Sequence, residues 1–173
     1  MQKVTIVKGD ITRLKVDAVV NAANSRLQAG GGVCGAIFRA AGYGELQDAC
    51  DKIGVCPTGS VVITEAFHLD AKYIIHAVGP IYQGGKHGEK EALYGTYKKA
   101  LQLALENHCA SIAFPLISAG IYGYPKEEAW EVAKKACEDF IQENVMAELT
   151  ITFAVLDDDI LNMGMRIFRN ESL

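Results

Sequence analysis

Two carboxamides and a run of three glycines stand close together near the start of the chain, in the stretch VDAVVNAANSRLQAGGGVCGAIFRAAG (residues 16–42). Asn21 and Asn24 are uncharged and follow a short apolar run, whereas glycines 30–32 directly precede a small-residue segment, 33–41, with helical spacing. Glycine has no Cβ, so backbone N–H groups there can touch a ligand, and the start of a helix favours anions. The stretch therefore indicates a site where backbone contacts an anionic ligand, in preference to a merely flexible loop.

The same glycines also fit the dinucleotide-binding pattern G-x-G-x-x-G, as Gly30, Gly32 and Gly35. That pattern requires glycines tight against the end of a strand, but residues 21–29 intervene here. It also requires an acidic residue roughly 20 positions on, at the end of a second strand. The acids near that distance lie in a helical pattern, 43–53. A nicotinamide-dependent oxidoreductase is therefore only a third interpretation, and we expect no cofactor.

Length and charge predict one soluble domain over residues 1–173. Half of the residues are hydrophobic, 22% are charged, and the net charge is −4. The pairs Lys98–Lys99 and Lys134–Lys135 are isolated on amphipathic patterns, so we expect neither a nucleic-acid surface nor membrane binding. A diphosphate could still bind, through backbone amides instead of lysines.

The five cysteines (34, 50, 56, 109 and 137) are odd in number and form no C-x-x-C pair. The first residues lack an apolar signal-peptide core, and no run approaches 18 apolar residues. We therefore expect a cytoplasmic protein with reduced thiols. A zinc site built from Cys34, Cys50 and Cys56 is disfavoured by their spacing, and the triple Asp at 157–159 is better explained as a helix N-cap, so no metal is expected.

Strand-like and helical segments alternate along the chain without repeats or linkers. Strands are predicted at 4–7, 17–20, 60–64, 73–78, 111–116 and 149–156, and helices at 33–41, 43–53, 89–107, 126–144 and from 157 onwards. Several strands are apolar on both faces, which predicts a three-layer α/β/α sandwich with a mixed, mostly parallel central sheet. His76 lies inside an apolar strand and is interpreted as a core histidine rather than a general base. The Gly-rich segment 82–88 is expected to be mobile.

Several short motifs occur in an order that resembles one family. They are G-D-I-T (9–12), N-A-A-N (21–24) with G-G-G-V (30–33), C-P-T-G (56–59), I-I-H-A-V-G-P (74–80) and I-S-A-G-I-Y-G-Y-P (117–125). Together they resemble the macrodomains, modules that bind ADP-ribose, and specifically the MacroD-type branch. The resemblance covers nearly the whole chain and implies the same sandwich fold.

The resemblance also implies which residues hold the ligand. Asp10 would accept a hydrogen bond from the adenine amino group, and the Ile11 amide would contact the ring. Asn24 would hydrogen-bond the distal ribose, since an amide both donates to and accepts from a diol. Residues 118–122 would wrap the diphosphate, with Tyr122 as a lid over the ribose. The implied ligand-binding residues are Asp10, Ile11, Asn24, Gly30, Gly31, Gly32, Val33, Ser118, Ala119, Gly120, Ile121, Tyr122 and Leu156.

Three positions depart from the family pattern. Leu156 stands where an aromatic residue often stacks on adenine, Cys34 replaces an Asp thought to activate water, and Phe38 replaces a His. The catalytic candidates are accordingly Asn24 and Cys34, and a thiol is mostly protonated at neutral pH. Two functions remain open: weak hydrolysis of ADP-ribosyl linkages, on mono-ADP-ribosylated protein or O-acetyl-ADP-ribose, and non-catalytic reading of ADP-ribose. The expected partners are ADP-ribose or ADP-ribosylated proteins, bound by a monomer.

Overall fold

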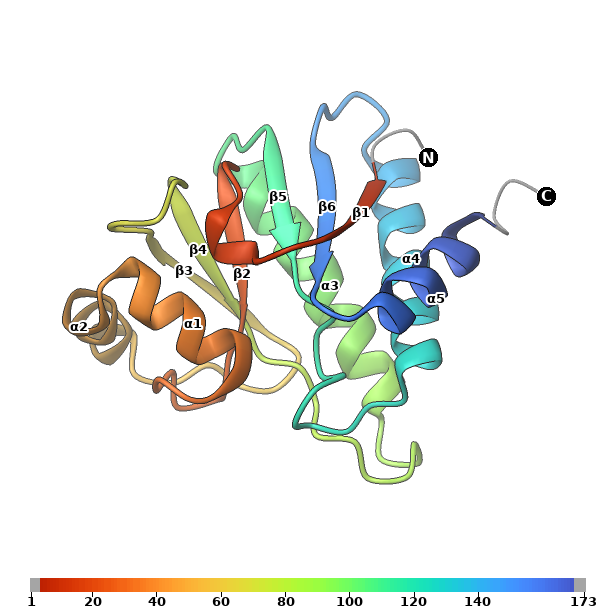
Figure 1. Cartoon of the computed structure of the whole chain (residues 1–173), viewed down its shortest axis with the longest axis horizontal. Coiled ribbons are helices and arrows are strands. Elements are labelled where there is room, and N and C mark those ends of the chain that lie inside the picture. Colours follow the sequence, from red (N-terminus) through yellow and green to blue (C-terminus); the bar gives the residue numbers. More distant parts are fainter. Residues whose placement is uncertain (1–3, 170–173) are drawn as a thin grey trace.

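The computed structural model describes residues 4–169 and contains a six-stranded sheet between two layers of helices (Figure 1). The strands are β1 (Val4–Lys8), β2 (Ala18–Ala22), β3 (Val61–Glu65), β4 (Tyr73–Ala77), β5 (Ser111–Phe114) and β6 (Thr150–Val155). Their order across the sheet is β1-β6-β5-β2-β4-β3. Every neighbouring pair is parallel except β3 with β4. The predicted mixed, mostly parallel sheet is thus confirmed.

Helices cover both faces of this sheet. The helices are α1 (Gly32–Ala41), α2 (Tyr43–Ile53), α3 (Glu89–Glu106), α4 (Lys126–Glu143) and α5 (Asp158–Arg169), and a short 3-10 helix, η1, spans Ile11–Arg13. Successive strand residues point to opposite faces, so Val19 packs with α1 and α2, whereas Val20 packs with α3 and α4. Burial on both faces explains the uninterrupted apolar runs of the strands and confirms the three-layer sandwich.

Strands β1, β2, β4, β5 and β6 all run in the same direction, so their carboxyl ends meet at one edge of the sheet (Figure 1). The loops that leave this edge include residues 23–31 after β2 and 115–125 after β5. Open parallel sheets bind ligands at this edge. The fold therefore brings together the two glycine-containing loops that the sequence separates by about 90 residues.

Several strand ends differ from the sequence prediction by one or two residues, and two of these differences have identifiable reasons. Strand β2 continues to Ala22, because Asn21 pairs with His76 of β4 in register and bonds to its side chain. Strand β5 ends at Phe114, since Pro115 has no N–H to continue the ladder. Asn21 is therefore a strand residue with its side chain beneath the loop, not a member of the loop.

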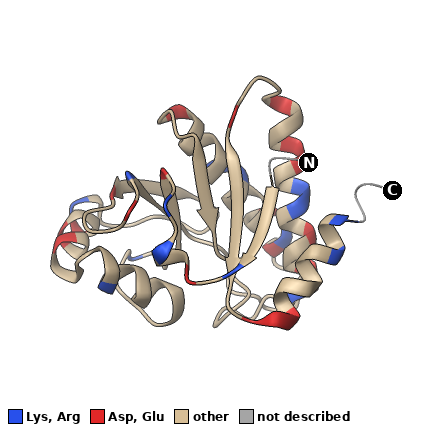
Figure 2. Cartoon of the chain, turned by 45° about the horizontal axis from the view of Figure 1, so that its top comes forward, with Lys and Arg blue, Asp and Glu red and all other residues tan. Residues whose placement is uncertain are grey.

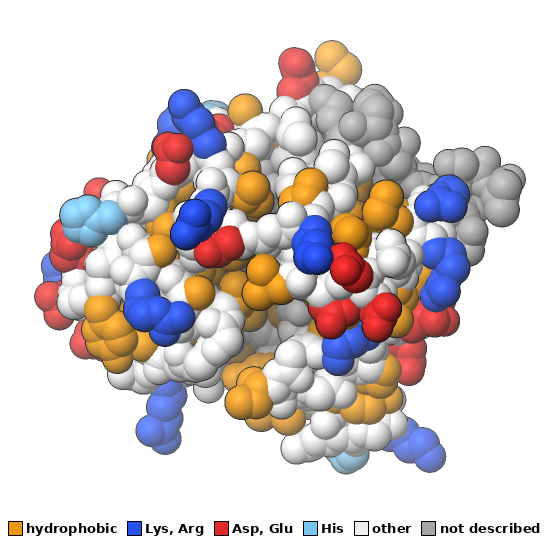
Figure 3. Space-filling model, viewed as in Figure 1, with side chains coloured by type: hydrophobic (Ala, Val, Ile, Leu, Met, Phe, Trp, Pro, Cys, Tyr) orange, Lys and Arg blue, Asp and Glu red, His pale blue; other side chains and the backbone are white. Residues whose placement is uncertain are grey.

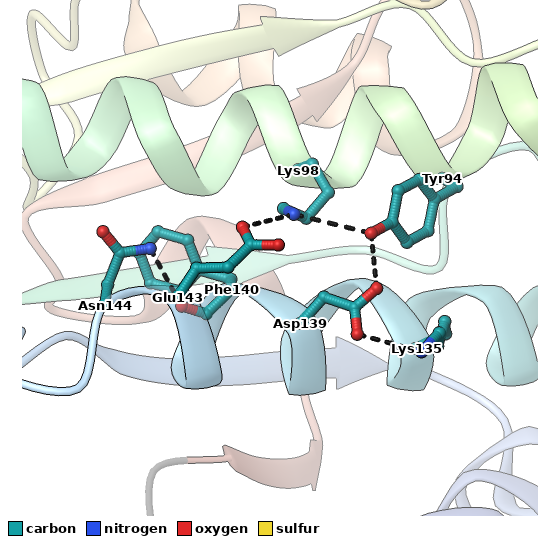
Figure 4. A network of polar contacts seen from close by, with 7 residues as sticks. All are labelled: Tyr94, Lys98, Lys135, Asp139, Phe140, Glu143 and Asn144. Carbon is teal, nitrogen blue, oxygen red and sulfur yellow. Dashed lines mark hydrogen bonds and ion pairs between the residues drawn. The ribbon is translucent and has the colours of Figure 1, made fainter.

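Side-chain contacts fasten α3 to α4 on the face away from α1 (Figure 4). Tyr94 Oη donates to Asp139 Oδ2 at 2.5 Å, and Lys98 Nζ lies 2.7 Å from Glu143 Oε1. Lys135 Nζ adds a 3.0 Å contact with Asp139 Oδ1 along α4. Partly exposed pairs of this kind contribute about 0.2–1 kcal/mol each, so they fix the register of the helices more than they stabilise the fold.

Basic and acidic residues are interspersed along several elements, as Figure 2 shows. In the lysine pairs of α3 and α4, Lys98 forms an ion pair with Glu143, Lys134 with Glu138 and Lys135 with Asp139. Between residues 4 and 169, no helix has the length and apolar character that crossing a membrane requires.

Candidate functional site

A cavity of about 370 Å³ opens between the start of α1 and the loop that follows β5. In the space-filling view, hydrophobic side chains and white atoms, which are backbone or other side chains, border the hollow near the centre of this face (Figure 3). The residues that line the cavity carry no charged side chain. They are Ala22, Ala23, Asn24, Gly30, Gly31, Gly32, Val33, Cys34, Gly79, Pro115, Leu116, Ile117, Ser118, Gly120, Ile121 and Tyr122.

The first wall of the cavity is the glycine loop that leads into α1. Gly31 is the N-cap and offers no side chain, so the first amides of the helix remain available to a ligand. Gly32 has φ +57°, a left-handed conformation that favours glycine. A Cβ on Gly35 would clash with the Gly30 carbonyl oxygen, which means that the loop lies directly against the helix. The glycines thus allow a close approach, of backbone to backbone and of backbone to ligand.

Two side-chain amides hold this loop in place. Asn24 Nδ2 donates to the Gln28 carbonyl at 2.8 Å, and Asn24 Oδ1 accepts from the Gln28 N–H at 3.0 Å. From α2, Gln47 accepts from the Ala29 N–H at 3.1 Å and donates to the Leu27 carbonyl at 3.1 Å. Asn24 lines the cavity and retains one further N–H and one lone pair, so it can fasten the loop and contact a ligand at once.

The second wall follows β5 and centres on Ser118. This residue is 6% exposed, has φ +67°, and its hydroxyl oxygen has no hydrogen-bond partner. A non-glycine residue in that conformation costs about 1–3 kcal/mol and persists only where its surroundings enforce it. Here the Tyr124 N–H donates to the Ser118 carbonyl at 2.9 Å, and a Cβ on Gly79 would meet Ile117 Cγ2 at 2.6 Å. Ser118 lines the cavity as a residue, although its hydroxyl oxygen is itself buried beside Gly79.

A buried polar chain lies beneath the first wall. Asn21 Nδ2 lies 3.1 Å from His76 Nδ1, and His76 Nε2 lies 3.0 Å from Thr64 Oγ1. Because an amide nitrogen only donates, His76 Nδ1 accepts and Nε2 carries the proton. The Thr64 hydroxyl then donates to the Glu65 carbonyl at 3.0 Å. His76 is fully buried and uncharged, which agrees with its interpretation as a core histidine.

Burial lowers the pKa of His76 to about 4, and this shift predicts a pH dependence of stability. Unfolded histidine binds a proton near pH 6.5, so acid favours the unfolded chain, and the contribution is present at neutral pH and lost as pH falls towards 4. We expect the free energy of unfolding to fall by about 2–3 kcal/mol more in the parent than in His76→Gln between about pH 7 and 4.5. Urea denaturation at several pH values checks this, and parallel curves for the two proteins would contradict it.

Cys34 lines the cavity at the third position of α1 and is 7% exposed. Its Sγ lies 3.8 Å from the Gln28 carbonyl oxygen. Burial raises the pKa of the Cys34 thiol, although hydrogen bonds from the Asn21 side chain and the Gly30 backbone oppose the shift. The thiol is therefore protonated at neutral pH. Phe38, one turn later, points away into the core, where its ring lies 5.9 Å from that of Tyr43.

Most of the residues that the sequence nominated do line the cavity, but four do not. Asp10 and Leu156 lie at the ends of β1 and β6, which adjoin through a 2.9 Å bond from the Gly9 N–H to the Val155 carbonyl. Leu156 is 75% exposed, whereas Ile11 and Ala119 are buried at 4%. Asp10, Ile11 and Leu156 thus form a separate group along the same sheet edge, and Ala119 lies behind the second wall.

Sequence reasoning missed several lining residues. The missed positions are Ala22, Ala23, Gly79, Pro115, Leu116 and Ile117. Gly79 had a usable signal, because a glycine that ends a predicted strand marks a close approach of another segment. The apolar residues after β5 carry no such signal, since their exposure to a cavity depends on the neighbouring loop.

The cysteines that the zinc alternative required do not form a metal cluster. Cys34, Cys50 and Cys56 are buried free thiols. Within the part of the chain that the structure describes, no three His, Cys, Asp or Glu side chains gather in a way that could hold a metal ion.

Comparisons with known proteins agree with this geometry. Residues 20–133 match the family model described as Macro domain. A protein named O-acetyl-ADP-ribose deacetylase from Salmonella gallinarum is 47% identical, over 98% of this chain and 96% of its own length. A mutant of the Oceanobacillus iheyensis macrodomain, solved with ADPR, superposes with a TM-score of 0.90 at 36% identity, covering 96% of this chain and 92% of that one. The Trypanosoma brucei macrodomain in complex with ADP-ribose superposes with a TM-score of 0.88 at 36% identity, covering 95% and 68% respectively. The chain belongs to the Macro domain family.

Proposed function

We propose that the domain binds ADP-ribose along the carboxyl edge of its sheet and hydrolyses ADP-ribosyl linkages slowly. One observation carries the proposal: a cavity without charged side chains lies between the start of α1 and a loop whose buried Ser118 hydroxyl has no partner. A diphosphate fits such a cavity because helix-start amides and loop amides supply the positive potential that lysines would otherwise supply. The binding of ADP-ribose by structural relatives supports the assignment.

The two groups of residues would contact different parts of ADP-ribose. Asp10 and Leu156, at the ends of β1 and β6, would receive adenine, with the Ile11 amide beside the ring. Residues 118–122 and the start of α1 would hold the diphosphate from opposite sides. Asn24 and Tyr122 would then enclose the distal ribose. In this arrangement Ala119, which is buried, contributes its backbone only.

Hydrolysis would require a water molecule between the diphosphate and the backbone of the Gly30–Val33 segment. From O-acetyl-ADP-ribose, the addition of water would break the ester bond and release acetate and ADP-ribose. The relatives named O-acetyl-ADP-ribose deacetylase support this reaction, at 47% and 48% identity over almost the whole chain. Holding water and ligand in one geometry replaces part of the entropy loss of a bimolecular encounter, so turnover survives without a strong base.

A reader that binds ADP-ribose without turnover is the second candidate, and Cys34 favours it. Burial raises the pKa of this thiol, so no ionised group stands at the position next to the expected water. Phe38 is buried in the core and supplies no second polar group.

One experiment separates the candidates. Isothermal titration with ADP-ribose measures binding, and incubation with mono-ADP-ribosylated protein and with O-acetyl-ADP-ribose measures release. Binding with slow release supports the hydrolase, binding without release supports the reader, and absence of binding overturns both. A spectral titration with a nicotinamide dinucleotide tests the third interpretation, an oxidoreductase.

Adenine recognition is expected to depend on the Asp10 carboxylate. Asp10 Oδ1 already caps η1, accepting from the Thr12 N–H at 2.9 Å and the Thr12 hydroxyl at 2.7 Å, so Oδ2, which lies 3.7 Å from Arg13 Nε, is the oxygen that would accept from the adenine amino group. Loss of a charge-assisted hydrogen bond costs about 1.5–3 kcal/mol, so Asp10→Ala should weaken ADP-ribose binding roughly 10- to 150-fold. Titration calorimetry measures the change.

The Asp10→Asn variant is the matched control for the capping function. Its amide oxygen can still cap the Thr12 N–H, but its NH₂ would meet the adenine amino donor, so binding should be as weak as in Asp10→Ala. Parent-like affinity in Asp10→Asn would place adenine elsewhere.

A further inference from the structure

Glu89 is a buried carboxylate that organises the loop after β4. Its side chain is 3% exposed and accepts hydrogen bonds from three N–H groups of the preceding loop, those of Gln83 (2.7 Å), Gly85 (3.1 Å) and His87 (2.7 Å). Each of these donors lies in the Gly-rich segment 82–88, which the sequence predicted to be mobile. In the structure this segment is folded around one anion, in the way that backbone amides surround a bound phosphate.

The carboxylate is ionised in this setting. Burial alone would raise the pKa of Glu89, but hydrogen bonds from the backbone of Gln83, His87, Glu89 itself and Gly85 lower it to about 2. A neutral carboxamide of the same shape could not accept all of these hydrogen bonds, because its NH₂ group would present N–H donors where the loop also presents N–H donors. The loop geometry therefore depends on the charge as well as on the size of residue 89.

The organised segment touches the second wall of the cavity directly. The Tyr82 N–H donates to the Tyr122 carbonyl at 2.8 Å, and the Tyr82 and Tyr124 rings meet edge to face with centroids 4.9 Å apart. Figure 1 shows the two loops side by side at the lower edge of the molecule, beside the start of α3. Tyr122 lines the cavity, while Tyr124 is bonded to the Ser118 carbonyl. A displacement of Tyr82 would therefore disturb both Tyr122 and Tyr124 in the second wall.

We propose that Glu89 is a positioning residue for ligand binding: it fixes the segment 82–88, and Tyr82 then holds Tyr122 and the 118–124 loop in the conformation that receives the diphosphate and distal ribose. This inference rests on the proposed ADP-ribose site but assigns a function to residues outside the cavity. Glu89 would affect the binding of the diphosphate and distal ribose only. The adenine would lie at Asp10 and Leu156, at the ends of β1 and β6, away from the segment 82–88.

The first test compares Glu89→Gln with Glu91→Gln, titrated against ADP-ribose, ADP and AMP. Glu91 lies in the same first turn of α3 and is exposed, so its variant makes the same charge change without touching the loop. If only a fraction of the molecules keeps the loop ordered, the apparent affinity for the ligand falls in proportion to that fraction. We expect Glu89→Gln to weaken the binding of ADP-ribose roughly 5- to 20-fold, the binding of ADP by a smaller factor, and the binding of AMP by less than about twofold. Glu91→Gln should bind all three ligands as the parent does. Equal losses for all three ligands, or none, would overturn the proposal.

A second pair of variants leaves the carboxylate intact. Gly84 and Gly85 have φ of +87° and +84°, so alanine imposes similar backbone strain at both positions. A Cβ on Gly85 would lie 2.7 Å from Tyr82 Oη, whereas nothing lies within 4 Å of a Cβ on Gly84. Gly85→Ala should therefore displace the Tyr82 ring and selectively weaken the binding of ADP-ribose. Gly84→Ala should bind ADP-ribose more tightly than Gly85→Ala does. Equal affinities for the two variants would argue against transmission through Tyr82.

A measurement without ligand separates this inference from the proposed function. Amide hydrogen exchange in the ligand-free protein should be faster at Tyr82 and Tyr124 in Glu89→Gln than in the parent, with Glu91→Gln unchanged. These two amides are the donors to Tyr122 and Ser118. Unchanged exchange in a folded Glu89→Gln protein would overturn the proposal, whatever the parent binds. If the parent binds no ADP-ribose but exchange is still faster in Glu89→Gln than in the parent, the coupling of the loops stands and only the ligand assignment is removed.

Discussion

Replacing Gly120 by glutamate is expected to abolish ADP-ribose binding while leaving the fold intact. Gly120 lines the cavity, nothing lies within 4 Å of a Cβ built on it, and its φ lies outside the positive range. The side chain therefore enters free space without backbone strain. In the complex that space would hold diphosphate, so the carboxylate would add like-charge repulsion of about 1–4 kcal/mol at 4 Å to a steric clash. Titration calorimetry should show a loss of at least about 100-fold.

Gly44→Glu is the matched control for this substitution. Gly44 lies in α2, has no atom within 4 Å of a built Cβ, and does not line the cavity. Glutamate there adds the same charge to the protein, so parent-like affinity would show that net charge is not responsible. Gly32→Glu should also abolish binding, although its φ of +57° adds strain to the first turn of α1. Unchanged titration curves for Gly120→Glu and Gly32→Glu would mean that the glycine loops are only flexible connections.

The sequence predicted the layers of this fold because their cause is local. Segments that are apolar on both faces, such as β4 and β6, have to lie inside a sheet covered by helices. Glycine runs followed by helical patterns likewise predicted the first wall at Gly30, Gly31 and Gly32. Element bounds shifted by one or two residues where a specific contact decided them, as with Asn21 opposite His76.

What the sequence could not predict are the contacts between loops. Asn24 was expected to face the ligand, but in the structure it also fastens its own loop through Gln28. Glu89 reads as one of several acids at the start of a helix, and only the folded loop shows three amides converging on it. The unusual conformation of Ser118 depends on packing against Gly79, which lies 39 positions earlier in the chain. Such features arise from tertiary structure, and no single-residue propensity encodes them.

Cys34→Asp is expected to raise hydrolytic turnover by roughly 10²- to 10⁴-fold, the usual contribution of a positioned general base. Residue 34 is the third position of α1, where the helix dipole stabilises a carboxylate. The Asn21 side chain and the Gly30 N–H, which oppose the raised pKa of the thiol, would also favour an ionised Asp. Release of ADP-ribose from modified protein and of acetate from O-acetyl-ADP-ribose measures the gain.

Two further variants distinguish a base from a change of shape. Cys34→Asn has the size of Asp without its charge, and Cys34→Ala removes the thiol, so both should stay within a few-fold of the parent. A gain in Cys34→Asn equal to that in Cys34→Asp would attribute the effect to the cavity's shape. A Cys34→Ala protein that binds ADP-ribose normally but has no turnover would mean that the thiol takes part in the chemistry. If the parent releases nothing from either substrate and Cys34→Asp does, the domain is a reader because residue 34 carries no carboxylate next to an otherwise complete site.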